Sequence, residues 1–249
     1  MKKVLSFDLD DTLSLAKLPM EPEMAKAFGD LLEYYDMCVI SGAMFSQIKK
    51  QVVDVLNVPA ENLKRLHVMA SQGTKYWRFQ DGEWKVIYAD DLAPEKIAEI
   101  FKVLEESAKE AGYWCKNPAG EIIENRDNTQ VTMSAIGQKA RKEDKYAWDP
   151  DHKKREAIVK IAREKMPDLE FGIGGTTSID VTMPGVNKAY GMRKLMENND
   201  LEKSDILFFG DMTQVGGNDY PVAEMGIDTI TVKNWQETVN VLKGILAVS

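Results

Sequence analysis

The chain is poor in the residues that build histidine- or cysteine-based metal sites. Only two histidines, His67 and His152, and two cysteines, Cys38 and Cys115, occur among its 249 residues. The cysteines are far apart and match no zinc-ligand spacing, so we expect reduced thiols of a cytoplasmic protein. With so few histidines, a histidine-based zinc site is not expected either.

Long apolar runs and an excess of positive charge are also missing. No stretch approaches the roughly 18 consecutive apolar residues of a membrane-spanning helix, and the apolar run after the N-terminal Met-Lys-Lys is too short for a signal peptide. The formal net charge is −8, which disfavours nucleic acid or an anionic membrane as a partner. An anionic substrate would therefore require a local group of Lys and Arg residues, or a metal ion.

The chain does contain a series of short apolar runs that end in Gly, Ser or Asp. They are KVLSFDL, MCVISG, HVMASQG and DILFFGD, and such runs are typical of buried parallel strands. Amphipathic helical stretches, PEMAKAFGDLLEYY and MFSQIKKQVVDVL, separate the first three. This alternation predicts an α/β fold with a doubly wound parallel sheet, whose functional site lies at the carboxyl ends of the strands.

The middle of the chain follows a different pattern. After a hairpin candidate around Asp81-Gly82 come a long amphipathic helix over residues 94–111, strand-like segments and a charged helix, without strand–helix alternation. We therefore predict an α+β cap domain at residues 87–185, inserted into a core formed by residues 1–86 and 186–249. The long helix could also present a face for a homodimer formed through the cap.

Aspartates gather directly after two of the predicted strands. Asp8 and Asp10 follow the first strand, and Asp211 follows DILFFGD, with Asn218 and Asp219 after a Gly-Gly turn. Clustered carboxylates repel one another unless a cation is bound. If the two strands are neighbours in a parallel sheet, the four aspartates converge at one edge. They then predict a Mg²⁺ site, because Mg²⁺ prefers hard oxygen ligands and often shares them with a phosphate.

Two further residues complete the set that phosphoryl transfer requires. Ser41 ends a strand, where its hydroxyl and the following amide can bind phosphate oxygens. Lys188 opens a helix, where its ammonium can neutralise both a phosphorylated aspartate and an incoming phosphate. A Ser-Gly pair usually forms a turn and a helical lysine is usually solvated, so the prediction depends on the order DxD, Ser, Lys, GDxxxxGGND.

This order resembles the haloacid dehalogenase superfamily of aspartate-nucleophile phosphotransferases. The resemblance implies that Asp8 attacks phosphorus to form an aspartyl-phosphate and that Asp10 is the general acid and base. It also implies that Asp211 and the backbone carbonyl of Asp10 join Asp8 in binding Mg²⁺. Covalent catalysis of this kind divides one difficult transfer into two easier steps.

A closer resemblance, to the eukaryotic-type phosphomannomutases with their inserted α+β cap of the IIB type, spans nearly the whole chain. FFGDMTQVGGNDYPV is similar to that family's FFGDxTxxGGNDxxI, and IIENRDNTQVTMSAIGQ and GGTTSIDVTMPGVNKAYGMRKL are similar to two further motifs. By position, Arg126 would contact a phosphate held by the cap, and Ser178 and Asp180 would bind the sugar. Lys145 stands where a later cap arginine falls, and Asn218 of the GGND motif is a further candidate for substrate binding.

Two departures from this family's pattern concern the binding of anions. Gln138 and Lys145 stand where the family has arginines; a glutamine carries no charge, and a lysine lacks the bidentate fork of arginine. A mutase must hold a bisphosphorylated sugar in two orientations, whereas a phosphatase needs only to admit water to the aspartyl-phosphate. The sequence therefore favours a Mg²⁺-dependent phosphatase acting on a small phosphorylated metabolite, such as a sugar phosphate.

The sequence leaves two alternatives to the phosphatase. The first is a phosphomannomutase that interconverts mannose 6-phosphate and mannose 1-phosphate, since it shares the nucleophile, the metal and the cap. The second is a non-catalytic sugar-phosphate sensor, which is disfavoured because Asp8 and Asp10 are both intact.

Overall fold

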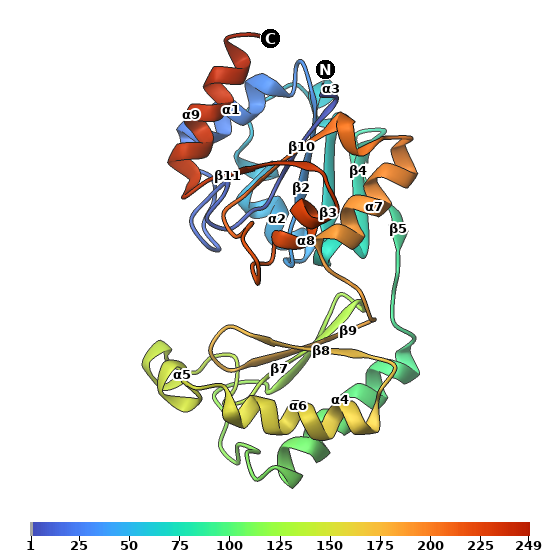
Figure 1. Cartoon of the computed structure of the whole chain (residues 1–249), viewed down its shortest axis with the longest axis vertical. Helices are drawn as coiled ribbons and strands as arrows, with labels where there is room; N and C mark the ends of the chain where they lie inside the picture. The colour runs from blue at the N-terminus through green and yellow to red at the C-terminus, as the bar shows by residue number, and fades with distance from the viewer. Residues whose placement is uncertain (1) are drawn as a thin grey trace. The chain divides into compact units, whose positions relative to one another are not determined.

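A computed structural model describes residues 2–249 of the chain. The chain forms two compact units (Figure 1). The core runs up to Ala89 and resumes at Val186, and the cap is Asp90–Gly185. Within the described residues, no helix is both long enough and apolar enough to cross a membrane.

The core is built on a seven-stranded sheet in the order β11-β10-β1-β2-β3-β4-β5. The first five strands in this order pair in parallel, and the hairpin β4–β5 extends the sheet in antiparallel fashion. The hairpin turns at Asp81-Gly82, where both residues have positive φ. The strands are β1 (Val4–Phe7), β2 (Asp36–Ile40), β3 (Leu66–Ala70), β4 (Lys75–Gln80), β5 (Glu83–Ala89), β10 (Ile206–Gly210) and β11 (Asp228–Thr231).

Helices cover both faces of the core sheet, as a doubly wound fold requires. Successive side chains of a strand point to opposite faces: Leu5 and Phe7 of β1 pack with α1 and α9, whereas Val4 packs with α7. Figure 1 shows α1 and α9 side by side. The helices are α1 (Pro22–Leu31), α2 (Phe45–Gln51), α3 (Ala60–Leu63), α7 (Lys188–Asn199), α8 (Tyr220–Glu224) and α9 (Trp235–Leu246).

The helix predicted over MFSQIKKQVVDVL is shorter than its sequence pattern indicates. α2 ends at Gln51, and a short 3₁₀ turn, η1 (Val53–Val55), follows it. The β-branched Val52 and Val53 lose rotamer freedom against the preceding turn, which weakens helix propagation there. The early end leaves Gln51 at the helix terminus, where its buried side chain faces the loop that follows β1.

The parallel register brings the ends of β1 and β10 together. Phe7, the last residue of β1, pairs with Phe209 of β10, and the rings of the two residues stack 4.7 Å apart. The backbone N–H of Asp8 continues this ladder by donating to the Phe209 carbonyl at 2.9 Å. The residues that leave these two strands, Asp8 and Asp211, therefore emerge side by side.

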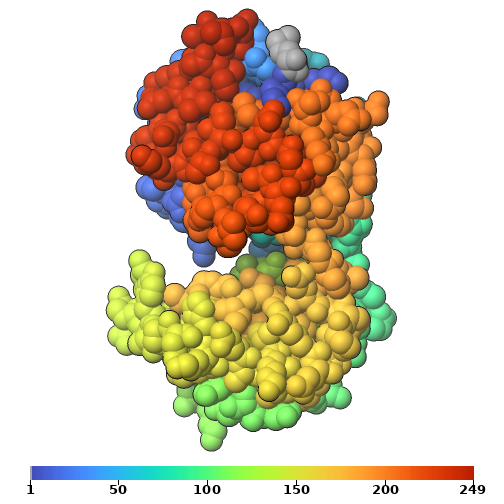
Figure 2. All heavy atoms as spheres, viewed as in Figure 1, coloured from blue at the N-terminus to red at the C-terminus, as the bar shows by residue number. Residues whose placement is uncertain are grey.

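The cap is a four-stranded antiparallel sheet in the order β6-β7-β9-β8, with α4 and α6 together on one face (Figure 1). Alternate strand residues such as Val131, Met133 and Ile179 are fully buried in the cluster that includes these helices. The short α5, which the sequence pattern did not indicate, stands out from the cap surface (Figure 2). The elements are α4 (Pro94–Glu110), β6 (Ile123–Arg126), β7 (Gln130–Ser134), α5 (Lys142–Trp148), α6 (Lys153–Lys165), β8 (Glu170–Gly174) and β9 (Ser178–Thr182).

A buried ion pair ties α6 to the rest of the cap. Arg155 Nε lies 2.7 Å from Asp149 Oδ2, and neither side chain is exposed. Arg155 Nη1 also donates to the carbonyls of Gly174 and Gly175, each at 2.9 Å. The guanidinium thus anchors the turn between β8 and β9. The predicted sugar-binding residues, Ser178 and Asp180, lie on β9.

Candidate active site

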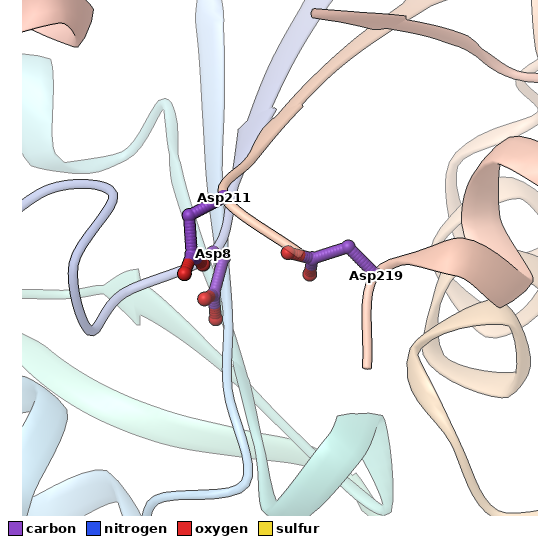
Figure 3. Close-up of side chains that lie close together, drawn as sticks. All are labelled: Asp8, Asp211 and Asp219. Atoms are coloured by element: carbon purple, nitrogen blue, oxygen red, sulfur yellow. The ribbon is translucent and has the colours of Figure 1, made fainter. Parts of the chain in front are cut away.

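Three aspartates of the core converge at the carboxyl edge of the sheet (Figure 3). Asp8 follows β1, Asp211 follows β10, and Asp219 immediately precedes α8. One oxygen from each carboxylate lies within 4.8 Å of the other two. Asp8 and Asp219 are buried and Asp211 is half-buried, so their mutual repulsion is poorly screened by water.

Lys188 joins two of these carboxylates. Its Nζ lies 2.5 Å from Asp8 Oδ1 and 2.5 Å from Asp219 Oδ1, and its side chain is 1% exposed. The lysine opens α7, whose start is fixed by Asn187 accepting a hydrogen bond from the Tyr190 N–H at 3.1 Å. Burial would lower the pKa of Lys188, but the charges of Asp8 and Asp219 outweigh burial and raise it. The lysine is therefore a fixed positive charge beside Asp8.

The electrostatic environment leaves the carboxylates short of positive charge. Burial raises the pKa of Asp8 to about 7, with the charge of Asp219 adding to this effect and Lys188 opposing it. Burial and the Asp219 charge likewise raise the pKa of Asp211. One ammonium group does not satisfy three carboxylates, and a hard divalent cation beside Asp8 and Asp211 would do so.

The three carboxylates are not equally well placed to bind such a cation. Asp8 and Asp211 turn their carboxylates toward the same region (Figure 3). Asp219 has both oxygens engaged, because Oδ1 accepts from Lys188 at 2.5 Å and Oδ2 accepts from the Met212 N–H at 3.0 Å. Asp219 thus holds the lysine and the loop, while Asp8 and Asp211 offer the better placed oxygens.

Two of the three glycines of the motif GDMTQVGGND, Gly210 and Gly217, are required by space. A Cβ on Gly210 would lie 2.4 Å from Asp219 Oδ2, and a Cβ on Gly217 would lie 1.9 Å from the Met212 carbonyl oxygen. Real Cβ atoms do not approach other atoms so closely, so any larger residue would push the loop away from Asp8. The loop can fold back onto the strand end only with glycine at both positions.

Asp10 lies outside the three-carboxylate cluster. It is half-buried, and its Oδ1 accepts hydrogen bonds from the Lys17 N–H at 2.9 Å and from Gln51 Nε2 at 3.1 Å. The next residue, Asp11, is exposed and has a φ of 63°, so its side chain does not join the cluster. Nearby, Thr12 Oγ1 lies 3.5 Å from Asp211 Oδ1. The carboxylate of Asp10 is therefore held separately from those of Asp8, Asp211 and Asp219.

The two remaining predicted core residues differ in burial. Ser41 directly follows β2 and is buried, and its Oγ accepts from the Ala43 N–H at 3.1 Å. Its carbonyl accepts from the Gln72 N–H at 2.8 Å, which links the ends of β2 and β3. Asn218 is exposed next to buried Asp219. Ser41 thus lies in an ordered turn at the same sheet edge as Asp8.

The cap sheet carries a polar face opposite its helices. Register pairs Arg126 with Gln130, and Thr132 with Asp180, so alternate residues of three strands share this face. Asp180 Oδ1 accepts from Gln130 Nε2 at 2.8 Å and from Thr132 Oγ1 at 2.7 Å. Ser178 lies two residues before Asp180 on β9, so its side chain is on the same face. Gln130 and Thr132 were not predicted as site residues, although the alternation of polar and apolar residues in QVTMS indicates a strand with one polar face.

The cationic residues of the cap are partly committed to other groups. Arg126 Nε donates to Glu124 Oε1 at 2.7 Å, and the arginine side chain is 36% exposed. Lys145 Nζ donates to the backbone carbonyl of Gln138 at 2.7 Å. Gln138 Nε2 is buried and has no hydrogen-bond partner among residues 2–249. Gln138 and Lys145, which occupy positions where the family has arginines, thus lie together, because Lys145 is hydrogen-bonded to the backbone of Gln138.

Comparison with known proteins agrees with this geometry. The family model described as eukaryotic phosphomannomutase matches residues 35–248. The phosphomannomutase of Schizosaccharomyces pombe is 29% identical over 255 residues, which cover 98% of this chain and 94% of that protein. The phosphomannomutase of Spinacia oleracea is 30% identical, with 87% of this chain and 84% of that protein covered.

Solved structures show the same fold at lower identity. An N-terminally truncated, IMP-bound IMP-nucleotidase from Plasmodium falciparum has a TM-score of 0.68 and 18% identity, covering 99% of this chain and 68% of that chain. A trehalose-6-phosphate phosphatase related protein has a TM-score of 0.61 and 17% identity, covering 99% and 98%. At these identities the likeness establishes the fold alone: a Rossmann-like haloacid dehalogenase core with an inserted cap, as the sequence predicted.

Proposed function

The chain belongs to the eukaryotic phosphomannomutase family, and on that premise we propose that it moves a phosphoryl group between positions of a hexose phosphate, as a phosphomannomutase. The relatives named phosphomannomutase support this reading better than the phosphatase that the sequence pattern favoured. The observation that carries the proposal is the buried Lys188 between Asp8 and Asp219, with Asp211 alongside. Such a site suits a carboxylate nucleophile and an anionic substrate.

In the first step, a carboxylate oxygen of Asp8 forms a bond to phosphorus while the bond from phosphorus to the sugar oxygen breaks. The electron pair stays on the sugar oxygen, which takes a proton from Asp10. Lys188 balances negative charge on the phosphoryl oxygens as they approach Asp8. Mg²⁺, held by Asp8, Asp211 and the Asp10 carbonyl, would neutralise further charge on the transferring group.

In the second step, a hexose monophosphate gives the proton of its hydroxyl at the unphosphorylated position to Asp10, and that oxygen attacks the same phosphorus. The bond between phosphorus and the Asp8 oxygen breaks, and the electron pair returns to Asp8. The product is a hexose bisphosphate, which returns to the first step with its other phosphate. If water attacks instead of the sugar, the product is inorganic phosphate. Mutase and phosphatase chemistry thus differ only in the acceptor that reaches Asp8.

The polar face of the cap would bind the part of the substrate that does not react. Arg126 would contact the second phosphate, since it is the cation of that face. Asp180 keeps Oδ2 free of hydrogen bonds from the described residues, and Ser178 lies beside it on β9, so both can bind sugar hydroxyls. Lys145 and Asn218 are also proposed substrate contacts, because of their positions in the family motifs.

A sugar-phosphate phosphatase is the second candidate, favoured by one specific observation. Lys145 donates to the Gln138 carbonyl, and Gln138 itself carries no charge. The cap therefore has less positive charge available for a second phosphate than two arginines would supply. A weaker hold on the phosphate of the hexose monophosphate would let this acceptor leave before the second transfer and expose the aspartyl-phosphate to water.

The experiment that tests the proposal follows both products at once. The protein is given mannose 1-phosphate, Mg²⁺ and a catalytic amount of a hexose 1,6-bisphosphate, and mannose 6-phosphate and inorganic phosphate are both measured. Isomerisation that far exceeds phosphate release supports the mutase. Phosphate release without isomerisation would replace it with the phosphatase, and the absence of both would overturn the proposed chemistry.

A further inference from the structure

Gln51 is a buried polar residue at the end of α2 whose amide contacts the loop that follows β1. It is 2% exposed, and its Nε2 lies 3.1 Å from each of three acceptors: Asp10 Oδ1, Ser14 Oγ and the Leu18 carbonyl. The two hydrogens of the amide are thus shared among three oxygens of one loop. Gln51 thus reaches Asp10 from another element of the core.

The orientation of the Gln51 amide is fixed from the other side. Gln47, one turn earlier on α2, donates from its Nε2 to Gln51 Oε1 at 2.8 Å. Because Oε1 is engaged as an acceptor, Nε2 must be the atom that faces Asp10. The helix between them is well anchored, since Ile48 is fully buried in the core cluster.

The contact leaves the two oxygens of Asp10 in different states. Oδ1 accepts from both Gln51 Nε2 and the Lys17 N–H, which fills its ordinary hydrogen-bonding capacity. Oδ2 accepts no hydrogen bond from residues 2–249, and the side chain is half-buried. One oxygen is thus held and the other is available for proton transfer.

Taking the phosphoryl transfer proposed above as given, we propose that Gln51 is a positioning residue that holds Asp10 Oδ1 so that Oδ2 faces the sugar oxygen. A general acid must lie within hydrogen-bond reach of the atom it protonates. Asp10 is in a loop that includes two left-handed residues, Asp11 and Lys17, and the loop itself holds the carboxylate through the Lys17 N–H. The link to α2 adds a constraint from outside the loop.

The test uses two phosphoryl donors that differ in their need for a proton. A sugar oxygen is a poor leaving group and must be protonated by Asp10. Acetyl phosphate instead releases acetate, which needs no proton. The value of kcat/KM reports the steps up to phosphorylation of Asp8 for both donors. Gln51→Met keeps the size of the side chain and removes the donor.

We expect Gln51→Met to lower kcat/KM for phosphate release from a hexose 1,6-bisphosphate by roughly 10–100-fold, because a misplaced acid forfeits much of its catalytic contribution. The loss for acetyl phosphate should be less than about 3-fold on the same reasoning. Gln51→Glu, which presents only acceptors to Asp10, should show the same selectivity. Ile48→Val, a buried change on the same helix, is the control and should lower both values equally or not at all.

Equal losses for the two donors in both Gln51 variants would mean that the residue only supports the fold, and would overturn the inference. Unchanged activity toward the hexose bisphosphate would overturn it as well. Failure of the proposed function is a separate result: the wild-type protein would then use neither donor. An active wild-type enzyme with donor-selective Gln51 variants supports both proposals.

Discussion

The ammonium of Lys188 lies 2.5 Å from Oδ1 of Asp8, and both side chains are buried. The same nitrogen lies 2.5 Å from Asp219 Oδ1, so one lysine links the proposed nucleophile to the loop after β10. Burial strengthens these interactions and makes the loss of any partner costly. The site is therefore both a catalytic arrangement and a structural connection between β1, α7 and the loop that precedes α8.

Replacing Lys188 should affect stability and activity separately. Lys188→Met leaves two buried carboxylates unpaired, and we expect the free energy of unfolding to fall by roughly 3–5 kcal/mol, with turnover lost. The double variant Lys188→Met, Asp219→Asn should recover part of the stability but none of the turnover. Urea unfolding and phosphoryl-transfer assays measure the two effects. A double variant no more stable than the single one would refute the pairing with Asp219.

Removal of metal should abolish turnover, and added Mg²⁺ should stabilise the protein through Asp211. A ligand that binds only the folded state raises its stability, so Mg²⁺ should raise the melting temperature of the wild type. Asp211→Asn should lose most of this increase. Asp11→Asn, an exposed change three residues after Asp8, is the matched control and should retain it. An undiminished increase in Asp211→Asn would place the cation elsewhere.

Much of the fold could be predicted from the sequence because its strongest signals are local. The apolar runs of β1, β2, β3 and β10, and the periodicity of α4, predict those elements without any tertiary information. α5 is different: it is short and exposed and has no apolar stripe, and a hydrogen bond from Lys145 to the Gln138 carbonyl holds it in place. β11 is an edge strand whose residues are half-buried or exposed, so it lacks the apolar run of the others.

The parts of the site that follow from the order of the strands could be predicted from the sequence. The contacts that long side chains make between distant elements could not. Asp8 and Asp211 follow neighbouring parallel strands, so their meeting follows from the strand order. The contact of Gln51 with Asp10 joins residues 41 positions apart and has no signature in composition or spacing. The functions of the Gln138 and Lys145 positions likewise depend on contacts within the cap.

The buried pair of Asp149 and Arg155 should make the cap sensitive to acid. Burial alone would raise the pKa of Asp149, but hydrogen bonds from Arg155 and from the Lys154 N–H lower it overall. A carboxyl whose pKa is lowered by folding contributes stability above its unfolded pKa of about 3.9, and that contribution is lost as the pH falls through the folded pKa.

We therefore expect Asp149→Asn to destabilise the protein by roughly 3 kcal/mol at pH 7, since it leaves Arg155 buried and unpaired. The difference from wild type should narrow as the pH falls below about 4. Urea unfolding at a series of pH values measures it. A difference that stays constant over this range would mean that ionisation of Asp149 does not contribute.

Restoring arginine in the cap should shift the balance between the two candidate activities. Gln138→Arg adds a positive charge with a bidentate fork beside Lys145. If the cap holds the phosphate that does not react, isomerisation should rise relative to phosphate release by several fold, because the hexose monophosphate stays longer beside the aspartyl-phosphate. Gln138→Met, which has no charge, is the control. An equal ratio in the wild type and both variants would mean that this position does not contact the substrate.

The central claim is that Asp8 carries the phosphoryl group. The direct measurement is to mix the protein with Mg²⁺ and a radiolabelled hexose bisphosphate, quench it in acid during turnover, and locate the label by peptide mass spectrometry. The account predicts one phosphoryl group on Asp8, and none in Asp8→Asn, which should fold normally but have no turnover. A label on another residue, or turnover of the wild type without any labelled intermediate, would contradict it.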